Sequence, residues 1–157
     1  GGGIPPDVTI EGHDYSRLTY SLVYSGIIQE YALDFVRSHD SAEEDFHLAD
    51  KDWDGFVAFA KTKEFDYRSS AKTYFDRMKK ELEKDGLSKN MSAELDALQK
   101  ALEMDKETFL KLKKDEIVPF IEEEIAVRYH FQEAGIKIRL RYDDQLKKAL
   151  ASPMIEI

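Results

Sequence analysis

Apolar residues recur along most of this chain at intervals of three and four, the spacing that lines one face of an α-helix. Trp53, Phe56, Val57 and Ala60 show it most clearly, at positions i, i+3, i+4 and i+7. A second run predicts a helix whose apolar face consists of Ala71, Tyr74, Phe75, Met78 and Leu82. Because the same period appears in several separate stretches, the sequence predicts a mainly α fold, a helical domain with a short N-terminal strand or extended segment.

Polar and breaking residues predict where the earlier helices begin and end. Residues 14–38 form one helical stretch that Gly26 kinks or divides, and residues 39–45 form a polar loop. Ser69 or Ser70 is expected to cap the next helix, and Gly86 is placed to end it. Another helix is expected to open at Ser92.

Two short strands are expected besides these helices. Residues 8–10 all have β-branched side chains and are followed by Glu11 and Gly12, which would end the strand. Residues 136–142 alternate apolar and basic side chains, which favours a strand, although a helix stays open over so short a run. Between them, a helical region runs over residues 106–135, with a break or a helix start expected just before Pro119. Residues 145–151 predict a last short helix that Pro153 stops.

The charge argues against nucleic acid and against anionic membrane surfaces as partners. Acidic residues outnumber basic ones 32 to 23, which gives a net charge of −9. A nucleic-acid-binding domain needs a basic surface for the phosphates, so no nucleic acid is expected. Two basic clusters are each followed by acidic residues and are expected to be solvated surfaces. One is residues 111–114, and the other consists of Lys137, Arg139 and Arg141. No apolar run approaches the roughly 20 residues of a membrane-spanning helix.

Candidate metal and cofactor sites in the sequence are incomplete. Residues 50–55 match the first six positions of an EF-hand calcium loop, but position 12, which needs a bidentate glutamate, is Lys61. The alternative is an acidic helix N-terminus at Asp50 and Asp52, which is favoured by the helix dipole. Glu44 and His47 make one Glu-x-x-His step where a di-iron bundle needs two. No metal ligands and no cofactor are therefore predicted.

Catalytic candidates are also absent. The chain has no cysteine, no phosphate-binding glycine loop and no nucleophile-elbow serine. Its serines are better explained as caps and helix-surface residues: Ser16, Ser21, Ser25, Ser69 and Ser70. Glu122 to Glu124 are expected to form a solvated helix face, with Glu124 and Arg128 at ion-pair spacing. No catalytic residue is predicted.

Three segments carry a resemblance to a known family. They are Gly-Gly-Ile-Pro-Pro-Asp at 2–7, Ile-Glu-Glu-Glu-Ile-Ala-Val-Arg-Tyr at 121–129 and Asp-Asp-Gln-Leu-Lys-Lys-Ala-Leu at 143–150. The first resembles a segment near the end of the catalytic domain of the carboxy-terminal-processing (tail-specific) serine peptidases. The others resemble the C-terminal helical extensions of one branch of that family. The resemblance implies a Ser/Lys peptidase with a PDZ-like domain, whose catalytic residues lie upstream of this chain.

This resemblance sets the expected organisation and partners. Residues 1–12 would be the extended end of the upstream peptidase domain, and residues 13–157 the C-terminal helical domain. The implied partners are the upstream catalytic and PDZ-like domains of the same chain, with a homo-oligomer also possible. Such enzymes work in the periplasm or elsewhere outside the cytoplasm, which is the expected location. The alternative left open is an autonomous helical protein–protein interaction module unrelated to proteolysis.

Overall fold

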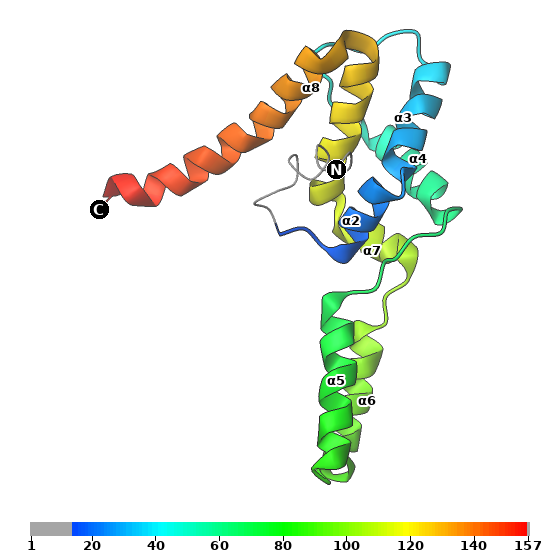
Figure 1. Cartoon of the computed structure of the whole chain (residues 1–157), viewed down its shortest axis with the longest axis vertical. Helices are drawn as coiled ribbons and strands as arrows, with labels where there is room; N and C mark the ends of the chain where they lie inside the picture. Colours follow the sequence, from blue (N-terminus) through cyan, green and yellow to red (C-terminus); the bar gives the residue numbers. More distant parts are fainter. Residues whose placement is uncertain (1–13, 157) are drawn as a thin grey trace, which may run out of the picture.

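The computed structural model describes the backbone of residues 14–156 and the side chains of residues 14–143. This part of the chain is helical and contains no strand. Figure 1 shows a helical body with two projections, a helical hairpin at one end and the distal part of the last helix. The mainly α prediction is therefore confirmed, whereas the predicted strand at 8–10 lies outside the described residues.

The body begins with two helices that a single glycine separates. α2 (Arg17–Tyr24) starts at Ser16, whose hydroxyl accepts a hydrogen bond from the Thr19 amide. α3 (Ile27–Ser38) follows after Gly26, whose φ of 82° lies in the left-handed region that favours glycine. The prediction that Gly26 divides this stretch is confirmed. The loop predicted at 39–45 is also present and extends to residue 49.

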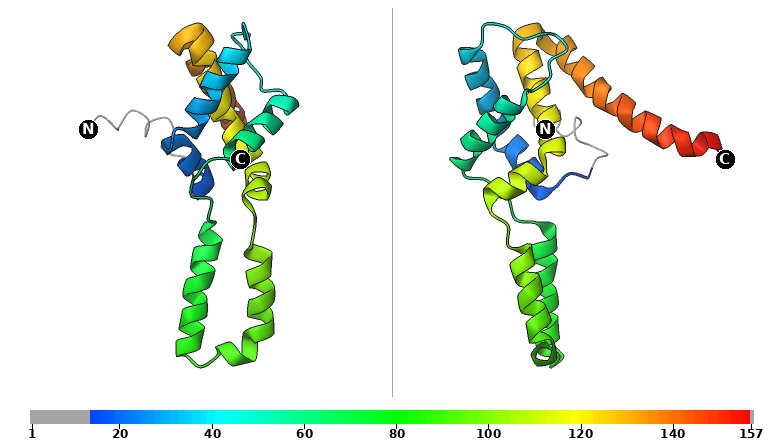
Figure 2. Two further views of the ribbon diagram at one scale, coloured as in Figure 1. Left: turned by 90° about the vertical axis from the view of Figure 1, so that its right-hand side faces the viewer. Right: turned by 180° about the vertical axis from the view of Figure 1, so that it is seen from behind.

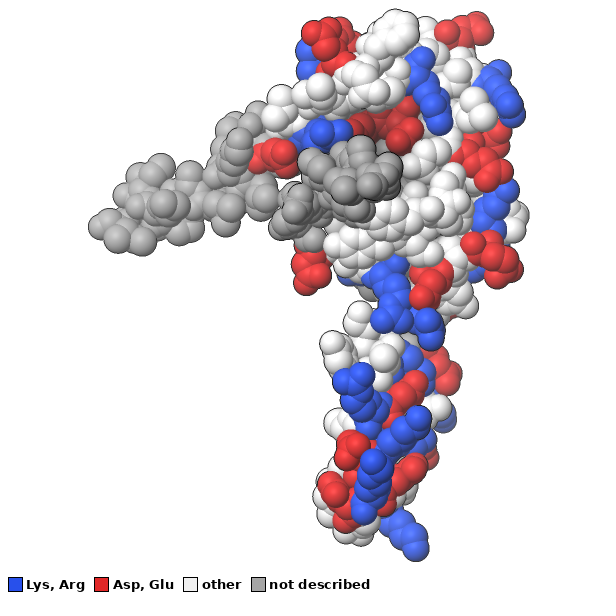
Figure 3. Space-filling model, in the orientation of Figure 1, with Lys and Arg blue, Asp and Glu red and all other residues white. Residues whose placement is uncertain are grey.

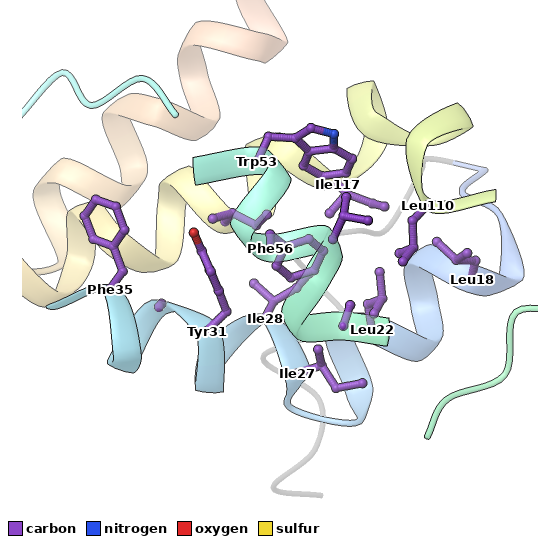
Figure 4. Packing of buried hydrophobic residues seen from close by; sticks show 14 of the residues in the cluster. Leu18, Leu22, Ile27, Ile28, Tyr31, Phe35, Trp53, Phe56, Leu110 and Ile117 are labelled. Atoms are coloured by element: carbon purple, nitrogen blue, oxygen red, sulfur yellow. The ribbon is translucent and has the colours of Figure 1, made fainter. Parts of the chain in front are cut away.

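The core lies between α2, α3, α4 (Asp50–Lys61), α7 (Lys106–Leu112) and the first part of α8 (Lys114–Glu156). The four apolar residues that predicted a helical face in α4 are all buried. Figure 4 shows Trp53 and Phe56 of this face, with Phe56 between Tyr31 of α3 and Ile117 of α8. The Phe56 and Tyr31 rings meet edge to face at 5.3 Å, and the Tyr31 hydroxyl donates to the Asp52 carbonyl at 2.8 Å.

The hairpin consists of α5 (Ser70–Lys84), a 3₁₀ turn η1 (Ser88–Met91) and α6 (Ser92–Leu102). We call residues 70–104 the arm. Ser69 caps α5 by accepting from the Lys72 amide at 3.0 Å, as predicted. Gly86, at φ 75°, ends the helix where the Leu87 amide bonds the Leu82 carbonyl at 2.9 Å. The views of Figure 2 agree that α5 and α6 lie side by side and point away from the body.

The predicted apolar face of α5 is only partly a core. Phe75 is buried, but Tyr74 is 64% exposed and Met78 is 44% exposed. The spacing correctly predicted that these residues lie close together on the surface of one helix. A two-helix hairpin has too little surface to cover all of them, so the rest stay in contact with solvent.

α8 reverses direction at Phe131, where φ is 65° and ψ is −169°. The helix therefore has two parts, residues 114–130 and 132–156. Gly135 lies close to the turn, and an added Cβ there would come within 2.4 Å of the Val127 side chain. A glycine at this position therefore lets the second part return closely against the first.

The C-terminal half contains the main errors of the sequence predictions. Residues 136–142 are helical, because Ala134 and Ile138 pack on Ala126 at a spacing of four while Ile136 and Leu140 remain exposed. Residues 145–151 belong to this same helix, which runs to Glu156, so Pro153 does not stop it. Pro119 lies inside α8, whose start is at Lys114, where the Ile117 amide bonds the Lys113 carbonyl.

Candidate functional site

The serines of the described region hold the backbone and do not form a nucleophile site. Ser16 and Ser69 are helix caps, as predicted. Ser21 accepts a hydrogen bond from the Asp66 amide at 2.8 Å, which fixes the connection between α4 and α5. A serine nucleophile needs a base within hydrogen-bond reach, and no described serine has a lysine partner of this kind.

The calcium-like pattern at residues 50–55 is helical, since α4 begins at Asp50. Asp50 and Asp52 occupy its first turn, as the alternative interpretation predicted. Asp50 pairs with Lys114 at 3.4 Å, and Trp53 is buried in the core. Within residues 14–143, no group of three His, Cys, Asp or Glu side chains is arranged to hold a metal ion.

The Glu-x-x-His step is likewise occupied by other contacts. Glu44 pairs with Lys137 at 2.7 Å, and this hydrogen bond, followed by the charge of Lys137, lowers the pKa of Glu44. His47 lies 3.7 Å from Asp45 and 3.2 Å from Arg141. These contacts attach the loop at 39–49 to the second part of α8.

The sequence prediction was wrong about Glu122, which is only 2% exposed instead of lying on a solvated face. Its carboxylate accepts hydrogen bonds from the Leu48 amide at 2.8 Å, from Arg141 at 2.9 Å and from the Tyr142 hydroxyl. Arg141 also donates to the Phe46 carbonyl at 3.0 Å and pairs with Asp45 at 2.6 Å. We call these groups the Glu122 cluster. It joins both parts of α8 to the loop at 39–49.

The surroundings of the Glu122 cluster keep its tyrosine neutral. Burial, followed by the hydrogen bond and the charge of Glu122, raises the pKa of Tyr142 to about 12. Arg141, predicted to be part of a solvated basic cluster, has a side chain only 18% exposed. Because every oxygen of Glu122 has a donor, the cluster has the chemistry of a structural clamp and lacks a group that could attack a substrate. By contrast, Glu124 and Arg128 form the predicted ion pair, at 3.8 Å.

A second carboxylate holds the start of the described chain. One oxygen of Glu116 accepts from the Ser16 amide at 3.0 Å and from the Thr19 hydroxyl at 2.8 Å. Desolvation raises the pKa of Glu116, but these two hydrogen bonds and the charge of Lys113 outweigh it, and the net pKa is lowered. Glu116 therefore fixes the N-terminus of α2 to the first turn of α8.

An apolar groove of about 620 Å³ lies where the arm joins the body. Its walls come from the segment before α5 and the first turn of α5, from the end of α6 and the connection after it, and from α7: Tyr67, Ala71, Ala101, Leu102, Met104, Phe109 and Leu112. Three cations on its rim are already paired with acids, Arg68 with Asp66, Lys72 with Asp76 and Lys113 with Glu116. The groove thus offers apolar contact and no arrangement of groups for catalysis.

A row of aromatic rings lies on the body beside the first described residue. Tyr15 contacts Phe120 with ring centres 5.3 Å apart and Tyr20 at 5.9 Å. Tyr20 in turn stacks with Tyr24 at 6.3 Å, and Tyr24 is 53% exposed. We call these four residues the aromatic row. Periodicity alone did not predict it, because its members come from the start of the chain, from α2 and from α8.

Comparison with known proteins identifies the family. A family model described as the C-terminal helical domain of a probable PDZ-protease matches residues 18–152. No curated protein and no solved structure gives a significant match. Over the described residues, no helix is both long enough and apolar enough to span a bilayer. The match covers the body, the arm and both parts of α8, and the chain belongs to the family of C-terminal helical domains of PDZ-proteases.

Proposed function

We propose that this domain is a non-catalytic support of a carboxy-terminal-processing serine endopeptidase, acting by packing on the catalytic domain or on another subunit. The observation that carries the proposal is the aromatic row, which lies where the described chain continues from the preceding residues. Tyrosine and phenylalanine are enriched in the buried centres of protein interfaces. The row therefore has the composition and the place expected of a contact with an upstream catalytic domain.

The contacts around the row support this role. The Glu116 hydrogen bonds hold Ser16 and Thr19 on α8, so Tyr15 and Tyr20 are carried on a fixed frame. A fixed frame lowers the entropy that side chains lose on association. Neither the groove nor the Glu122 cluster supplies a nucleophile and base, which agrees with a supporting role. Work outside the cytoplasm is part of the proposal and rests on the family resemblance.

The proposal is tested in the complete protease. Tyr24→Ala should lower its unfolding temperature and expose the junction between the two domains to limited proteolysis. Leu33→Ala is the matched control, since Leu33 is 41% exposed on α3 outside the aromatic row. If both variants behave like the wild type, the aromatic row does not contact the catalytic domain, and the domain is better described as an autonomous interaction module.

A further inference from the structure

The arm is a long projection with very little core of its own. Of its 35 residues, Phe75 and Leu95 are the only hydrophobic side chains that are buried. Helices of this length gain most of their stability from packing an apolar face. Structures below about 40 residues usually need a disulfide, a metal or association with another chain. The sequence has no cysteine, so no disulfide can brace the arm, and its exposed apolar residues favour association with another surface.

The two edges of the arm differ in chemistry. On one edge Lys79 of α5 donates to Gln99 of α6 at 3.3 Å. The buried Phe75 and Leu95 mark where the two helices face each other. Lys79 and Gln99 lie four residues after them, on one side of this contact, and Met78 and Leu98 lie three residues after them, on the other side. They are 44% and 43% exposed, and Tyr74, one turn from Met78, is 64% exposed. We call these three residues the apolar edge.

The apolar edge continues along the arm. At the tip, Leu87 is 41% exposed and Met91, two turns before Leu98, is 37% exposed. At the base, Ala71 and Ala101 belong to the wall of the apolar groove. An unbranched methionine adapts its shape to a partner, and the arm carries three of the four methionines of the chain, at 78, 91 and 104. A facing pair of helices would cover this edge along its length.

The charges of the arm favour a second copy of the arm as that partner. Residues 70–104 contain seven basic and seven acidic residues, so the arm is neutral although the chain carries −9. Within it, α5 has five basic and three acidic residues, whereas residues 85–104 have two basic and four acidic ones. Figure 3 shows both signs interleaved along the arm. In a two-fold symmetric pair, α5 would lie against the acidic half of the other arm.

We propose that two copies of this chain associate through their arms, forming an antiparallel four-helix bundle with the apolar edges inside. Such bundles pack two helical hairpins around a shared apolar core. The basic α5 of one copy pairs with the acidic residues 85–104 of the other. The two acidic bodies then lie at opposite ends of the bundle, away from each other. This self-association rests on the proposed packing against another subunit and names the surface for it, which is distinct from the aromatic row.

Sedimentation equilibrium of the 157-residue chain tests the proposal. We expect a dimer that dissociates on dilution through the micromolar range. Met78→Glu and Leu98→Glu should each weaken the dimer by about a hundredfold or more, because a symmetric interface buries each substituted residue twice. Leu33→Glu changes an equally exposed leucine on the body and should leave the dimer intact. Circular dichroism confirms that each variant is still helical.

Cross-linking provides a second measurement that does not depend on the stability of the variants. Because the chain has no cysteine, Leu98→Cys introduces a single thiol, and Leu33→Cys serves as the control. A short bis-maleimide should link two copies through position 98 and should not link them through position 33. A chain that remains monomeric at the highest concentration measured would overturn the proposal, as would a dimer that Met78→Glu and Leu98→Glu leave unchanged.

Discussion

Removing the buried carboxylate of the Glu122 cluster is expected to destabilise the domain strongly. In Glu122→Ala the Leu48 amide and the Tyr142 hydroxyl lose their acceptor, and Arg141 loses a charged partner. Breaking a buried pair by deleting one partner costs about 3–5 kcal/mol. Arg141 keeps Asp45 and the Phe46 carbonyl, so we expect the lower end of this range, about 3 kcal/mol.

The loss is measured by urea and thermal unfolding of the 157-residue chain. For a domain of this size, about 3 kcal/mol corresponds to a fall of roughly 6–12 °C in Tm. Glu124→Ala is the control in the same helix. Its carboxylate pairs with Arg128 at 3.8 Å, and burial, the largest cause, raises the pKa of Glu124, so its removal should cost about 0–1 kcal/mol.

Hydrogen exchange separates local release from global loss. In Glu122→Ala the amides of residues 132–143 should exchange faster than those of α3 and α4, because the cluster is the most buried of the polar attachments of the second part of α8, which also include the Glu44–Lys137 and Glu123–Arg139 ion pairs. Glu122→Gln keeps an oxygen acceptor and should lie between the wild type and Glu122→Ala. If Glu122→Ala unfolds within about 1 kcal/mol of Glu124→Ala and exchange is unchanged, the cluster does not hold the two parts of α8 together.

The remaining predictions concern other parts of the fold. Phe131→Gly should stabilise the chain by about 1 kcal/mol, because the turn lies in a region that glycine favours and the Phe131 side chain is 80% exposed; a loss of stability in urea unfolding would contradict this. Gly135→Ala should destabilise by about 1–3 kcal/mol through its contact with Val127, and an unchanged urea midpoint would oppose the close return of α8. Folding lowers the pKa of Glu116 from its ordinary 4.5, so the ionised carboxylate stabilises the fold above that pH, and this contribution is lost as the pH falls through the folded pKa. Glu116→Gln should therefore lose less stability than the wild type as the solution is acidified. Identical pH profiles of stability for the two proteins would contradict this role of Glu116. Deleting residues 1–10 should change the Tm little, since the core described above is built from residues 18–125, and a large fall would place those residues in the core.

Local features of the sequence were enough to predict most of the helices. The spacing of Trp53, Phe56, Val57 and Ala60 depends only on the helical period, and Ser69 and Gly86 act on their own neighbours. Such signals lie within a few residues of the helix that they define, so they do not depend on how distant segments pack. The division at Gly26 was predictable for the same reason.

Features that depend on distant segments were not predictable. Glu122 has the sequence context of a solvated glutamate, and only the return of α8 brings Arg141 and Tyr142 to it. The alternation at 136–142 suggested a strand because the residues that select the helix, Ala126 and Ile138, meet only after the turn at Phe131. The aromatic row also joins positions about 100 residues apart. Neither the row nor the Glu122 cluster has a local signal.

Because α8 turns at Phe131, a small rotation at this turn displaces the far end of its second part by a larger distance. A helix over residues 132–156 is roughly 37 Å long at about 1.5 Å per residue, and Figure 1 shows its distal end standing away from the body. Hydrogen bonds from Arg141 and Tyr142 to Glu122 hold the first half of this helix on the body. A rotation of about 5° at the turn would move the far end by roughly 3 Å, about two residues of helical rise. Small changes in the fit between Gly135 and Val127 would therefore be magnified in the position of the distal end of α8.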